Sequence, residues 1–537
     1  MHVRASRWAR VLCMACIGAC SGGGGGGQTS GGVPDGVNVN AGPDGGSTDA
    51  GAPDAGAADV GSPDAGRPDG GSDGGVTLGP PLSKDGWTFY ASSQGLPGDV
   101  SDVSADEGGN VYVAGGDAVY VKKRVDQQFL RFDARSAGLT ENCYPVANPN
   151  DATQLDRKLH PDPPGPALMC PVISVAGAAP GIAMVGFQGI GTDGDDDADW
   201  AQDSGGGDLV AFDGANLTRT RHVFIASPPH TICPSNGDEA HTYSCSYAYD
   251  WFWVMGRRKL RQVERIVVNH GKGSAMYGDF FMSGTHASIS ALLNNAAARG
   301  YPDRITGQPA RWLDAAGVWE HDHPAFYSAS RNAFLTGESH ALAIDPRSGT
   351  PWCSNGFRTA YLTGGYGPDL HGGDDWWLHP QTPPHALYYD FWPDNTIPTE
   401  SLHNDVESLS FCPDGALWIG SGIHGLARMD PGGGVSYVGL PDPGLHGDSV
   451  LAVACDPSDR SLWIGLGWGG AMRLKNGTFI QLDPDDTSLP AFTHQPVRSI
   501  QIDAWSSPRI VYFAFEPSKD ASGNVTRPGG VAAYQGP

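Results

Sequence analysis

Basic residues are scarce in this sequence. The 537-residue chain has 34 lysine and arginine residues against 59 aspartate and glutamate residues, which gives a formal net charge of −25 at pH 7. Nucleic-acid binding needs a basic face for the phosphates. The composition therefore argues against a nucleic-acid partner.

Long apolar runs are also missing. Residues 11–19 form a short apolar stretch behind Arg4, Arg7 and Arg10, which is typical of a signal peptide and too short for a permanent transmembrane helix. No other stretch is long and apolar enough to cross a bilayer. Any membrane attachment is therefore expected through a lipid anchor.

Several enzyme motifs are absent as well. The sequence contains no nucleophile elbow, no glycine-rich phosphate loop, no zincin motif, and no Cys-x-x-Cys pair beyond residue 20. A serine or cysteine nucleophile stays open, because the members of a catalytic triad need not be close in sequence.

The N-terminus carries export features. Ile17-Gly18-Ala19-Cys20 resembles a bacterial lipobox, which implies that residues 1–20 are a lipoprotein signal peptide and that Cys20 is lipidated. An ordinary secretory signal cut nearby is the alternative. Ser21 follows Cys20, and the resemblance to lipoprotein sorting signals then favours the outer membrane. We expect an exported protein that is lipid-anchored in the cell envelope.

Residues 21–80 are of low complexity. They contain an unbroken glycine run at 22–27 and repeated Pro-Asp-Gly and Pro-Asp-Ala units. Almost no large apolar residue is present, so the segment cannot offset its ordering entropy. We expect a disordered tether that precedes a folded domain at residues 81–537.

Seven cysteines follow Cys20. An exported chain meets an oxidising compartment, so some of them should pair. The close candidates are Cys143 with Cys170 and Cys233 with Cys245. Three cysteines remain, Cys353, Cys412 and Cys455, so one of them has no partner for a disulfide. Their connectivity stays open.

A short unit recurs in the C-terminal third. Residues 406–411 alternate apolar and polar, Pro413-Asp414-Gly415 forms a turn signal, and Leu417-Trp418-Ile419-Gly420 follows. This is a β-hairpin pattern. The unit returns at Val450, with Leu-Trp-Ile-Gly at 462–465, and again at Val497. Repeats of roughly 40–50 residues with about four strands are propeller blades.

Working outward from these repeats predicts an all-β propeller with seven blades, and six or eight blades are the alternatives. The other four blades are expected to begin near Val100, Val172, Val263 and Ala341, with second strands at 110–115, 182–186, 275–278 and 351–353. In blade seven we expect the second strand at 510–513 and the third at 530–534. Residues 86–90 would supply its fourth strand and close the ring, which removes exposed sheet edges.

Leu-Pro-Gly-Asp-Val at 96–100, Leu-His-Asn-Asp-Val at 402–406 and the two Leu-Trp-Ile-Gly strands resemble the two-component-regulator propeller repeat. That resemblance implies the seven-bladed fold of the periplasmic sensors of some hybrid histidine kinases. It implies a fold and leaves the function open.

Six of the 17 histidines are expected on one face near the axis, in loops before the first strand or between the second and third strands. They are His286, His340, His403, His424, His446 and His494. Imidazoles bind transition metals and titrate near neutrality, so the group is a candidate metal site or general base. The alternative is that each caps a turn or packs against a neighbouring loop.

An acidic stretch lies in the same class of loop in blade two. Asp193, Asp195, Asp197 and Asp199 alternate, as at the start of a calcium loop. Ala198 stands where a glycine is expected, and Ser204 where a glutamate should close the loop. A flexible acidic loop is the alternative.

Tryptophans form the third candidate site. Trp376 and Trp377, in a long insertion of blade four, and Trp468 could stack on sugars or peptides. Packing between blades is the alternative, as expected for Trp352, Trp418 and Trp463.

Binding is the leading function: a cell-envelope lipoprotein that presents a propeller to a protein, peptide or glycan ligand. The alternative is a metal-dependent lyase or hydrolase with a His-lined site, because streptogramin lyases are similar propellers with metal and histidine at the axis. A structural subunit of an envelope assembly is the third hypothesis. Calcium or a transition metal is the candidate cofactor.

Overall fold

The structure, a computed structural model of the chain, describes residues 80–148, 151–190 without 157, 198–223 without 203, 262–284 without 275, 290–294, 339–355, 405–441, 449–482, 495–520 and 524–536. It also describes short segments at 312–314, 326–328, 333–335, 359–362, 386–389 and 391–392. The predicted signal peptide with Cys20, and all of the predicted linker except residue 80, lie outside these residues.

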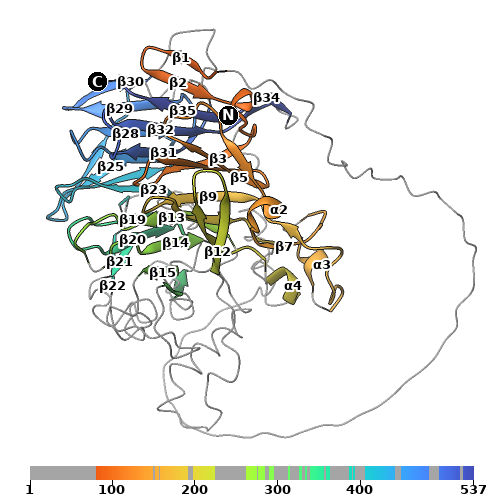
Figure 1. The fold of residues 1–537 in the computed structure, drawn as a ribbon. Helices are drawn as coiled ribbons and strands as arrows, with labels where there is room; N and C mark the ends of the chain where they lie inside the picture. The colour runs from red at the N-terminus through yellow and green to blue at the C-terminus, as the bar shows by residue number, and fades with distance from the viewer. Residues whose placement is uncertain are drawn as a thin grey trace, which may run out of the picture. The chain divides into compact units, whose positions relative to one another are not determined.

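Seven antiparallel sheets with four or more strands build the domain (Figure 1). In each sheet the first strand in sequence forms one edge, and six of the sheets have the following strands. Blade one has β3 (Val100–Ala105), β4 (Asn110–Gly115), β5 (Ala118–Lys123) and β6 (Leu130–Phe132); blade two has β9 (Val172–Gly177), β10 (Ile182–Phe187), β11 (Gly207–Phe212) and β12 (Leu217–Val223). Blade three has β13 (Val263–Val268), β14 (Phe280–Gly284), β15 (Ser290–Asn294) and β16 (Trp312–Asp314); blade four has β19 (Ser339–Ile344), β20 (Pro351–Asn355), β21 (Thr359–Leu362) and β22 (Ala386–Tyr389). Blade five has β23 (Val406–Phe411), β24 (Leu417–Ser421), β25 (Gly425–Met429) and β26 (Val435–Val438); blade six has β27 (Val450–Cys455), β28 (Leu462–Leu466), β29 (Ala471–Lys475) and β30 (Thr478–Gln481).

Blade seven combines the two ends of the domain. Its strand order is β31 (Val497–Asp503), β32 (Ile510–Phe515), β35 (Gly530–Tyr534), β2 (Trp87–Tyr90) and β1 (Leu82–Lys84). Thr88 pairs with Ala533 and Phe89 with Ala532. The predicted closure by residues 86–90 is therefore confirmed, and β1 adds a fifth strand.

The first strands form a closed series. β3 packs beside β9, and the series continues through β13, β19, β23 and β27 to β31, which packs back against β3. Seven sheets whose inner edges form a ring are a seven-bladed β-propeller. The predicted fold and blade number are confirmed.

Short elements lie outside the blade sheets. In the described parts of the chain, three two-stranded sheets pair β7 (Glu141–Cys143) with β8 (Leu168–Met169), β17 (Phe326–Ser328) with β18 (Ala333–Leu335), and β33 (Ser518–Lys519) with β34 (Val525–Arg527). The short helices are η1 (Ser92–Gln94), α2 (Ala134–Ala137), α3 (Ala152–Leu155) and α4 (Asp199–Gln202). Among the helices of the described residues, none has the length and apolarity needed to span a membrane.

The Leu-Trp-Ile-Gly strands show why the repeat has this sequence. Every residue of β24 and β28 is buried between neighbouring blades, which requires apolar side chains on both faces. A Cβ on Gly420 would lie 2.7 Å from Val450 of blade six, and one on Gly465 would lie 2.6 Å from the Val497 carbonyl oxygen. The glycine is needed because the first residue of the next blade packs directly on it. Trp352, Trp418 and Trp463 are buried as predicted.

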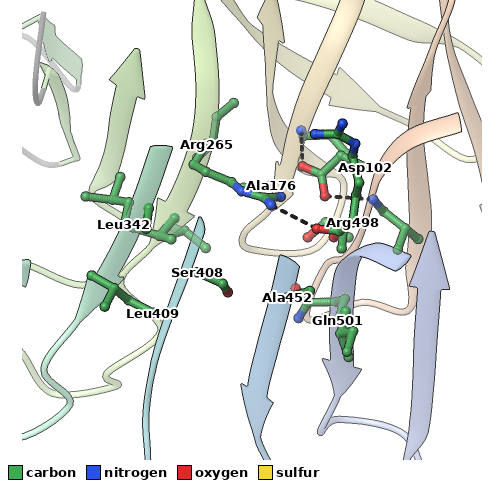
Figure 2. A pocket seen from close by; sticks show the side chains of 18 of the residues that line it. Asp102, Ala176, Arg265, Leu342, Ser408, Leu409, Ala452, Arg498 and Gln501 are labelled. Carbon is green, nitrogen blue, oxygen red and sulfur yellow. Dashed lines mark hydrogen bonds between the residues drawn. The ribbon is translucent and has the colours of Figure 1, made fainter. Parts of the chain in front are cut away.

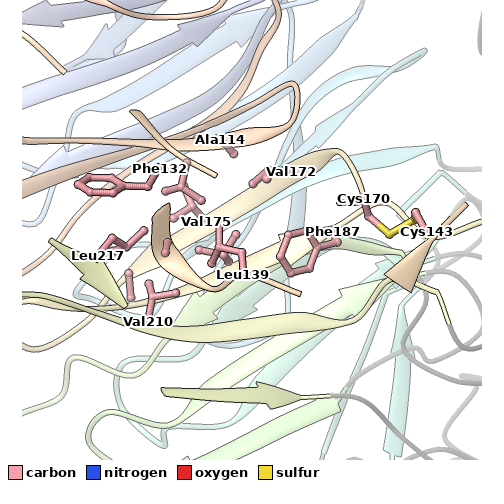
Figure 3. Packing of buried hydrophobic residues seen from close by; sticks show 14 of the residues in the cluster. Ala114, Phe132, Leu139, Cys143, Cys170, Val172, Val175, Phe187, Val210 and Leu217 are labelled. Carbon is pink, nitrogen blue, oxygen red and sulfur yellow. A yellow bond between two sulfur atoms is a disulfide. The ribbon is translucent and has the colours of Figure 1, made fainter. Parts of the chain in front are cut away.

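Apolar side chains fill the spaces between blades. Figure 3 shows one such cluster between blades one and two, where Phe132 lies near Val175 and Val210. The Phe132 and Phe212 rings meet edge to face with centroids 6.0 Å apart. Because each blade shares its core with two neighbours, the ring is stabilised as a whole.

The second strand of blade three differs from its prediction. It is β14 (Phe280–Gly284), and Met276 to Gly278 lie in the preceding turn. The Gly278 amide donates to the Asn269 carbonyl at 2.8 Å, and Gly278 has a φ of 80°. A left-handed glycine ends the apparent alternation and starts the strand two residues later.

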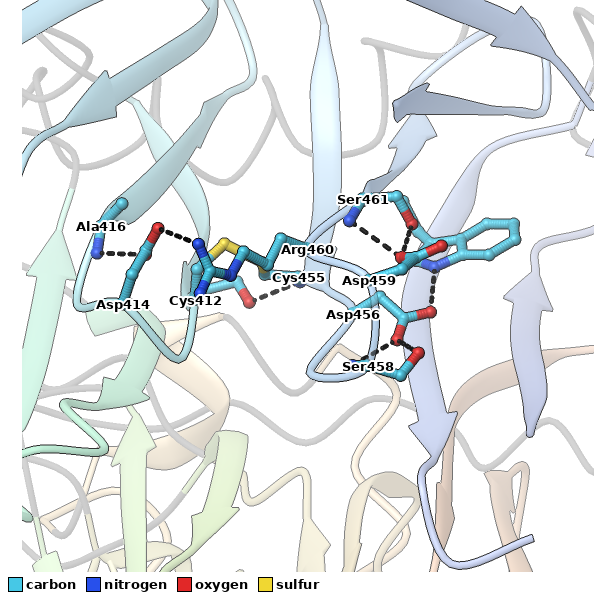
Figure 4. Close-up of a disulfide and its surroundings, with 11 residues drawn as sticks. Cys412, Asp414, Ala416, Cys455, Asp456, Ser458, Asp459, Arg460 and Ser461 are labelled. Atoms are coloured by element: carbon cyan, nitrogen blue, oxygen red, sulfur yellow. Dashed lines mark hydrogen bonds and ion pairs between the residues drawn. A yellow bond between two sulfur atoms is a disulfide. The ribbon is translucent and has the colours of Figure 1, made fainter. Parts of the chain in front are cut away.

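Two disulfides are present among the described cysteines. The predicted Cys143–Cys170 bond is confirmed (Figure 3). Cys412 bonds to Cys455 (Figure 4), so among the described cysteines Cys353, which is buried, is the one outside a disulfide. Cys233 and Cys245 lie outside the described residues.

The Cys412–Cys455 bond joins two blades at the ends of their inner strands. Beside it, Arg460 of blade six lies 3.9 Å from Asp414 of blade five (Figure 4). The bond closes a loop of 43 residues, and such cross-links stabilise mainly by restricting the unfolded chain. It therefore acts as a covalent tie between blades five and six.

Replacing both Cys412 and Cys455 by Ala should lower the free energy of unfolding by about 2–4 kcal/mol. Urea titration of the oxidised proteins measures this difference. In excess reductant the wild-type protein and the variant should become nearly equal. A difference that survives full reduction would show that packing, and not the cross-link, is responsible.

Candidate functional site

A polar cavity of about 220 Å³ lies on the axis of the propeller (Figure 2). Residues from the inner strands of all seven blades line it. The lining side chains that are polar or charged are Asp102, Ser104, Arg265, His270, Glu407, Ser408, Arg498, Ser499 and Gln501. This polar lining contrasts with the apolar packing between the blades.

Every inner strand has the same irregularity. The pairing with the second strand shifts between the first residue of the inner strand and the residue two positions later. Such β-bulges re-aim side chains. We call the seven residues after the shift the channel ring, and all of them except Ser174 line the cavity: Asp102, Ser174, Arg265, Ala341, Ser408, Ala452 and Ser499. Its charged members are Asp102 and Arg265.

Side chains of the channel ring and its neighbours satisfy the inner edges of adjacent blades. The amides of Val175 and Gly177 in blade two donate to Asp102 Oδ2 at 2.9 Å and Ser104 Oγ at 3.0 Å. Blade six repeats this arrangement, since the Val453 amide donates to Ser408 Oγ at 3.0 Å. A sheet edge that faces a cavity needs such partners for its backbone groups.

Asp102 is a buried carboxylate where blades two, five and seven have serine. It accepts from the amides of Val103 and Val175, both at 2.9 Å, and from Ser499. Burial raises its pKa, although the charge of Arg265 and these hydrogen bonds oppose the shift. Its negative charge is therefore held at a cost, with its lone pairs largely occupied.

Arg265 crosses the cavity from blade three to blade seven. Its Nη2 donates to the Arg498 carbonyl oxygen at 2.8 Å (Figure 2). The Arg498 guanidinium is itself paired with Glu516, and Glu407 of blade five also lines the cavity. The cavity thus combines positive and negative groups from different blades.

A second polar group lies where the inner strands end. Glu107 of blade one, which is 6% exposed, accepts from His270 Nδ1 at 3.1 Å and Tyr277 Oη at 2.9 Å, and Lys272 Nζ lies 3.1 Å away. The ring of His270 lies 4.7 Å from that of Trp505 in blade seven. His270 also lines the cavity, so this group meets the cavity wall through His270.

These contacts shift the pKa values of Glu107 and His270. Burial tends to raise the pKa of Glu107, but the hydrogen bonds from His270, Lys272 and Tyr277 outweigh it and leave the pKa below its usual 4.5. Burial lowers the pKa of His270 below its usual 6.5 despite the attraction of Glu107, with Lys272 adding to and Asp106 opposing the shift. The folded protein therefore favours an ionised Glu107 beside a neutral His270.

A pH titration of stability should reveal His270, whose side chain is 30% exposed. Below pH 6.5 the unfolded chain binds a proton at residue 270 more readily than the folded chain, so His270 makes stability fall as the pH decreases through this range. The His270→Gln variant should lose less stability than the wild-type protein between about pH 7 and 5. Urea unfolding at several pH values measures this, and parallel curves would contradict it.

The predicted histidine site is described only in part. His286, His403, His446 and His494 lie outside the described residues, and His340 lies in β19 with its side chain outside them. His424 lies in the turn between β24 and β25, as predicted, and its ring stacks on Trp392 with centroids 5.1 Å apart. For His424 the structure shows a packing contact, and for the other five the metal site stays a prediction.

The predicted calcium and tryptophan sites are also mostly untested. Asp193, Asp195, Asp197, Trp376 and Trp377 lie outside the described residues, while Asp199 begins α4 with its side chain outside them. Trp468, between β28 and β29, is 46% exposed. Among the described residues, no three His, Cys, Asp or Glu side chains are grouped so that they could hold a metal ion.

The sequence analysis missed the cavity residues. Their signal is visible in hindsight, because aligning the first strands at their leading residue places charged side chains one or two positions after it. Examples are Arg265 in blade three, Glu407 in blade five and Arg498 in blade seven. Alternation alone does not show that a bulge re-aims these positions.

Comparisons with known proteins add little to this description. No family model and no curated protein matches the chain. One similar solved structure is the extracellular domain of a hybrid two-component system from B. thetaiotaomicron, with a TM-score of 0.43, 12% identity and coverage of 83% of this chain. Another is YCF48 bound to a D1 peptide, with a TM-score of 0.42, 12% identity and coverage of 85% of this chain and 98% of that one. This chain covers 41% of the first structure. The propeller assignment rests on the seven sheets themselves.

Proposed function

We propose that this protein is a cell-envelope lipoprotein whose propeller binds a small polar ligand in the central cavity. The observation that carries the proposal is the cavity wall, where Asp102, Arg265 and Glu407 come from three different blades. Burying charged groups is costly, so a wall of this kind needs a functional or structural reason. The volume of about 220 Å³ equals that of about seven water molecules at roughly 30 Å³ each, which suits a small molecule.

The envelope assignment rests on the sequence, with support from the disulfides. The lipobox-like segment at Ile17 to Cys20 and the tether-like residues 21–80 are the features of an anchored exported domain. The two disulfides fit an oxidising compartment. The Leu-Trp-Ile-Gly strands support a likeness to the two-component-regulator propeller repeat, which builds the periplasmic sensors of some hybrid histidine kinases.

The loop face is a second binding surface in this proposal. Trp468 is 46% exposed in the loop between β28 and β29, and exposed tryptophan is typical of surfaces that hold peptides or sugars. A protein, peptide or glycan partner would contact this loop, together with Trp376 and Trp377 of the blade-four insertion.

A matched pair of variants tests the cavity. Ser408 and Ser410 each accept one amide of blade six, at 3.0 and 2.9 Å, but only Ser408 lines the cavity. A panel of small polar molecules should contain ligands that raise the melting temperature; at a hundred times Kd the stabilisation is about 2.7 kcal/mol. Ser408→Leu should abolish this effect and Ser410→Leu should retain it. Equal binding by both variants would place the ligand elsewhere.

A further inference from the structure

Arg265 differs from the other arginines that join blades. Arg124 pairs with Asp503 and Arg509 with Asp456, so each of these guanidiniums touches a carboxylate. Among the described residues Arg265 makes one hydrogen bond, from Nη2 to the Arg498 carbonyl oxygen at 2.8 Å, and no ion pair. A guanidinium has five N–H donors. Most of its donors therefore remain for a group inside the cavity.

Asp102 attracts Arg265 without occupying its donors. The Asp102 carboxylate already accepts from two amides and from Ser499. The hydrogen bond to the Arg498 carbonyl fixes where the guanidinium lies (Figure 2). The cation is thus positioned on the cavity wall before any ligand arrives, which reduces the ordering cost of binding.

Two hydroxyl groups add further donors. Ser104 Oγ and Ser408 Oγ each accept a backbone amide of the next blade. A hydroxyl carries one O–H donor besides its acceptor lone pairs, and neither hydroxyl donates to another described residue. Both serines line the same cavity as Arg265. This side of the wall therefore offers donors and suits an anionic group.

We propose that the ligand of the cavity carries one carboxylate, which Arg265 binds through its free N–H groups. This inference rests on the proposed function of the cavity. The planar fork of a guanidinium matches the two oxygens of a carboxylate. Because Asp102 and Glu407 lie on the same wall, a second carboxylate would be repelled. The ligand class is a small monocarboxylate, whose remaining part is neutral or cationic.

Isothermal titration calorimetry of the intact protein tests this proposal. The probes are acetate, propionate, glycine and alanine as monocarboxylates, succinate as a dicarboxylate, acetamide as a neutral analogue, methylamine as a cation, and inorganic phosphate. At least one monocarboxylate should bind more tightly than succinate, acetamide, methylamine and phosphate. Arg265→Met should weaken it at least about 30-fold, which is about 2 kcal/mol at 1.4 kcal/mol per tenfold.

Three further variants separate recognition from folding. Arg527, exposed on β34, is the matched control, and Arg527→Met should bind like wild type. Arg265→Lys keeps the positive charge but lacks the two parallel N–H donors of a guanidinium, so it should bind the carboxylate with intermediate affinity. Asp102→Ser places the residue of blades two, five and seven in blade one and removes a negative charge near Arg265. It should tighten carboxylate binding severalfold, an effect that a purely structural role for Arg265 would not produce.

The outcomes are distinguishable. If acetamide, methylamine or phosphate binds best, or if Arg265→Met binds the carboxylate as well as wild type does, the carboxylate inference fails while the cavity remains a binding site. If no probe binds and a broad small-molecule panel also leaves the melting temperature unchanged, the proposed function fails with it.

Discussion

A chain that begins at residue 91 should not form a stable propeller. It lacks β1 and β2 and therefore the strands that complete blade seven. Trp87 and Phe89 are 5% and 2% exposed in the intact domain. Losing a buried large aromatic side chain costs about 3–5 kcal/mol, so the loss of both approaches the whole stability of a typical domain, about 5–15 kcal/mol.

The packing around Trp87 explains the size of this effect. Its ring centroid lies 4.6 Å from that of Tyr534 and 5.6 Å from that of Phe513, which belong to β35 and β32. The same strand hydrogen-bonds to β35 along its length. Removing it therefore opens both a hydrophobic cluster and a sheet edge.

Circular dichroism and urea titration of chains starting at residues 80 and 91 measure this prediction. The chain that starts at 80 is the control and should be as stable as the full protein. A synthetic peptide of residues 80–91 should restore folding of the shorter chain by pairing with β35. Single substitutions in β2 should show the same effect. Trp87→Ala should lower the free energy of unfolding by about 3–5 kcal/mol, whereas replacing the half-buried Thr88 on the same strand by Ala should lower it much less. A shorter chain that melts with the full protein would contradict this account of closure.

The Arg124→Met variant should lose about 3–5 kcal/mol of stability. Arg124 of blade one donates to both oxygens of Asp503 in blade seven, from Nε at 2.6 Å and Nη2 at 2.9 Å. The Asp503 side chain is fully buried. Removing one partner of a buried ion pair leaves an uncompensated charge, and that accounts for the large cost.

A double-mutant cycle isolates this contact. The double variant Arg124→Met, Asp503→Asn should recover part of the loss, because no buried charge remains unpaired. Arg131→Met is the matched control, since Arg131 pairs with Asp117 at the surface and exposed pairs contribute about 0–1 kcal/mol. If Arg124→Met lowers the free energy of unfolding as little as the control does, strand pairing and packing alone would account for the attachment of blade seven to blade one.

The repeat could be predicted because its cause is local. Leu-Trp-Ile-Gly occurs where a strand is buried on both faces and the next blade packs on its glycine, as Val450 does on Gly420. The same repeat unit gave the ring closure, since a blade with three strands needs a fourth. In blade three the pattern misled, because a left-handed Gly278 delays the strand.

The cavity could not be predicted in the same way. Arg265 and the Arg498 carbonyl that fixes it are 233 residues apart, and no local pattern links them. The bulge that brings Arg265 and Asp102 into the channel ring leaves the alternation of residue types unchanged. The loop histidines were easier to recognise as a group, yet the described one, His424, stacks on Trp392.

The repeated bulge has a consequence for how such a protein can change over evolution. Each blade contributes one channel-ring position, and its neighbours in the strand carry the packing between blades. The channel ring already contains one aspartate, one arginine, three serines and two alanines, all on the same backbone geometry. These positions can therefore change one blade at a time, provided that the replacements for Asp102 and Ser408 still accept the amide of the next blade. Ligand preference in this architecture can diverge quickly even when the fold does not.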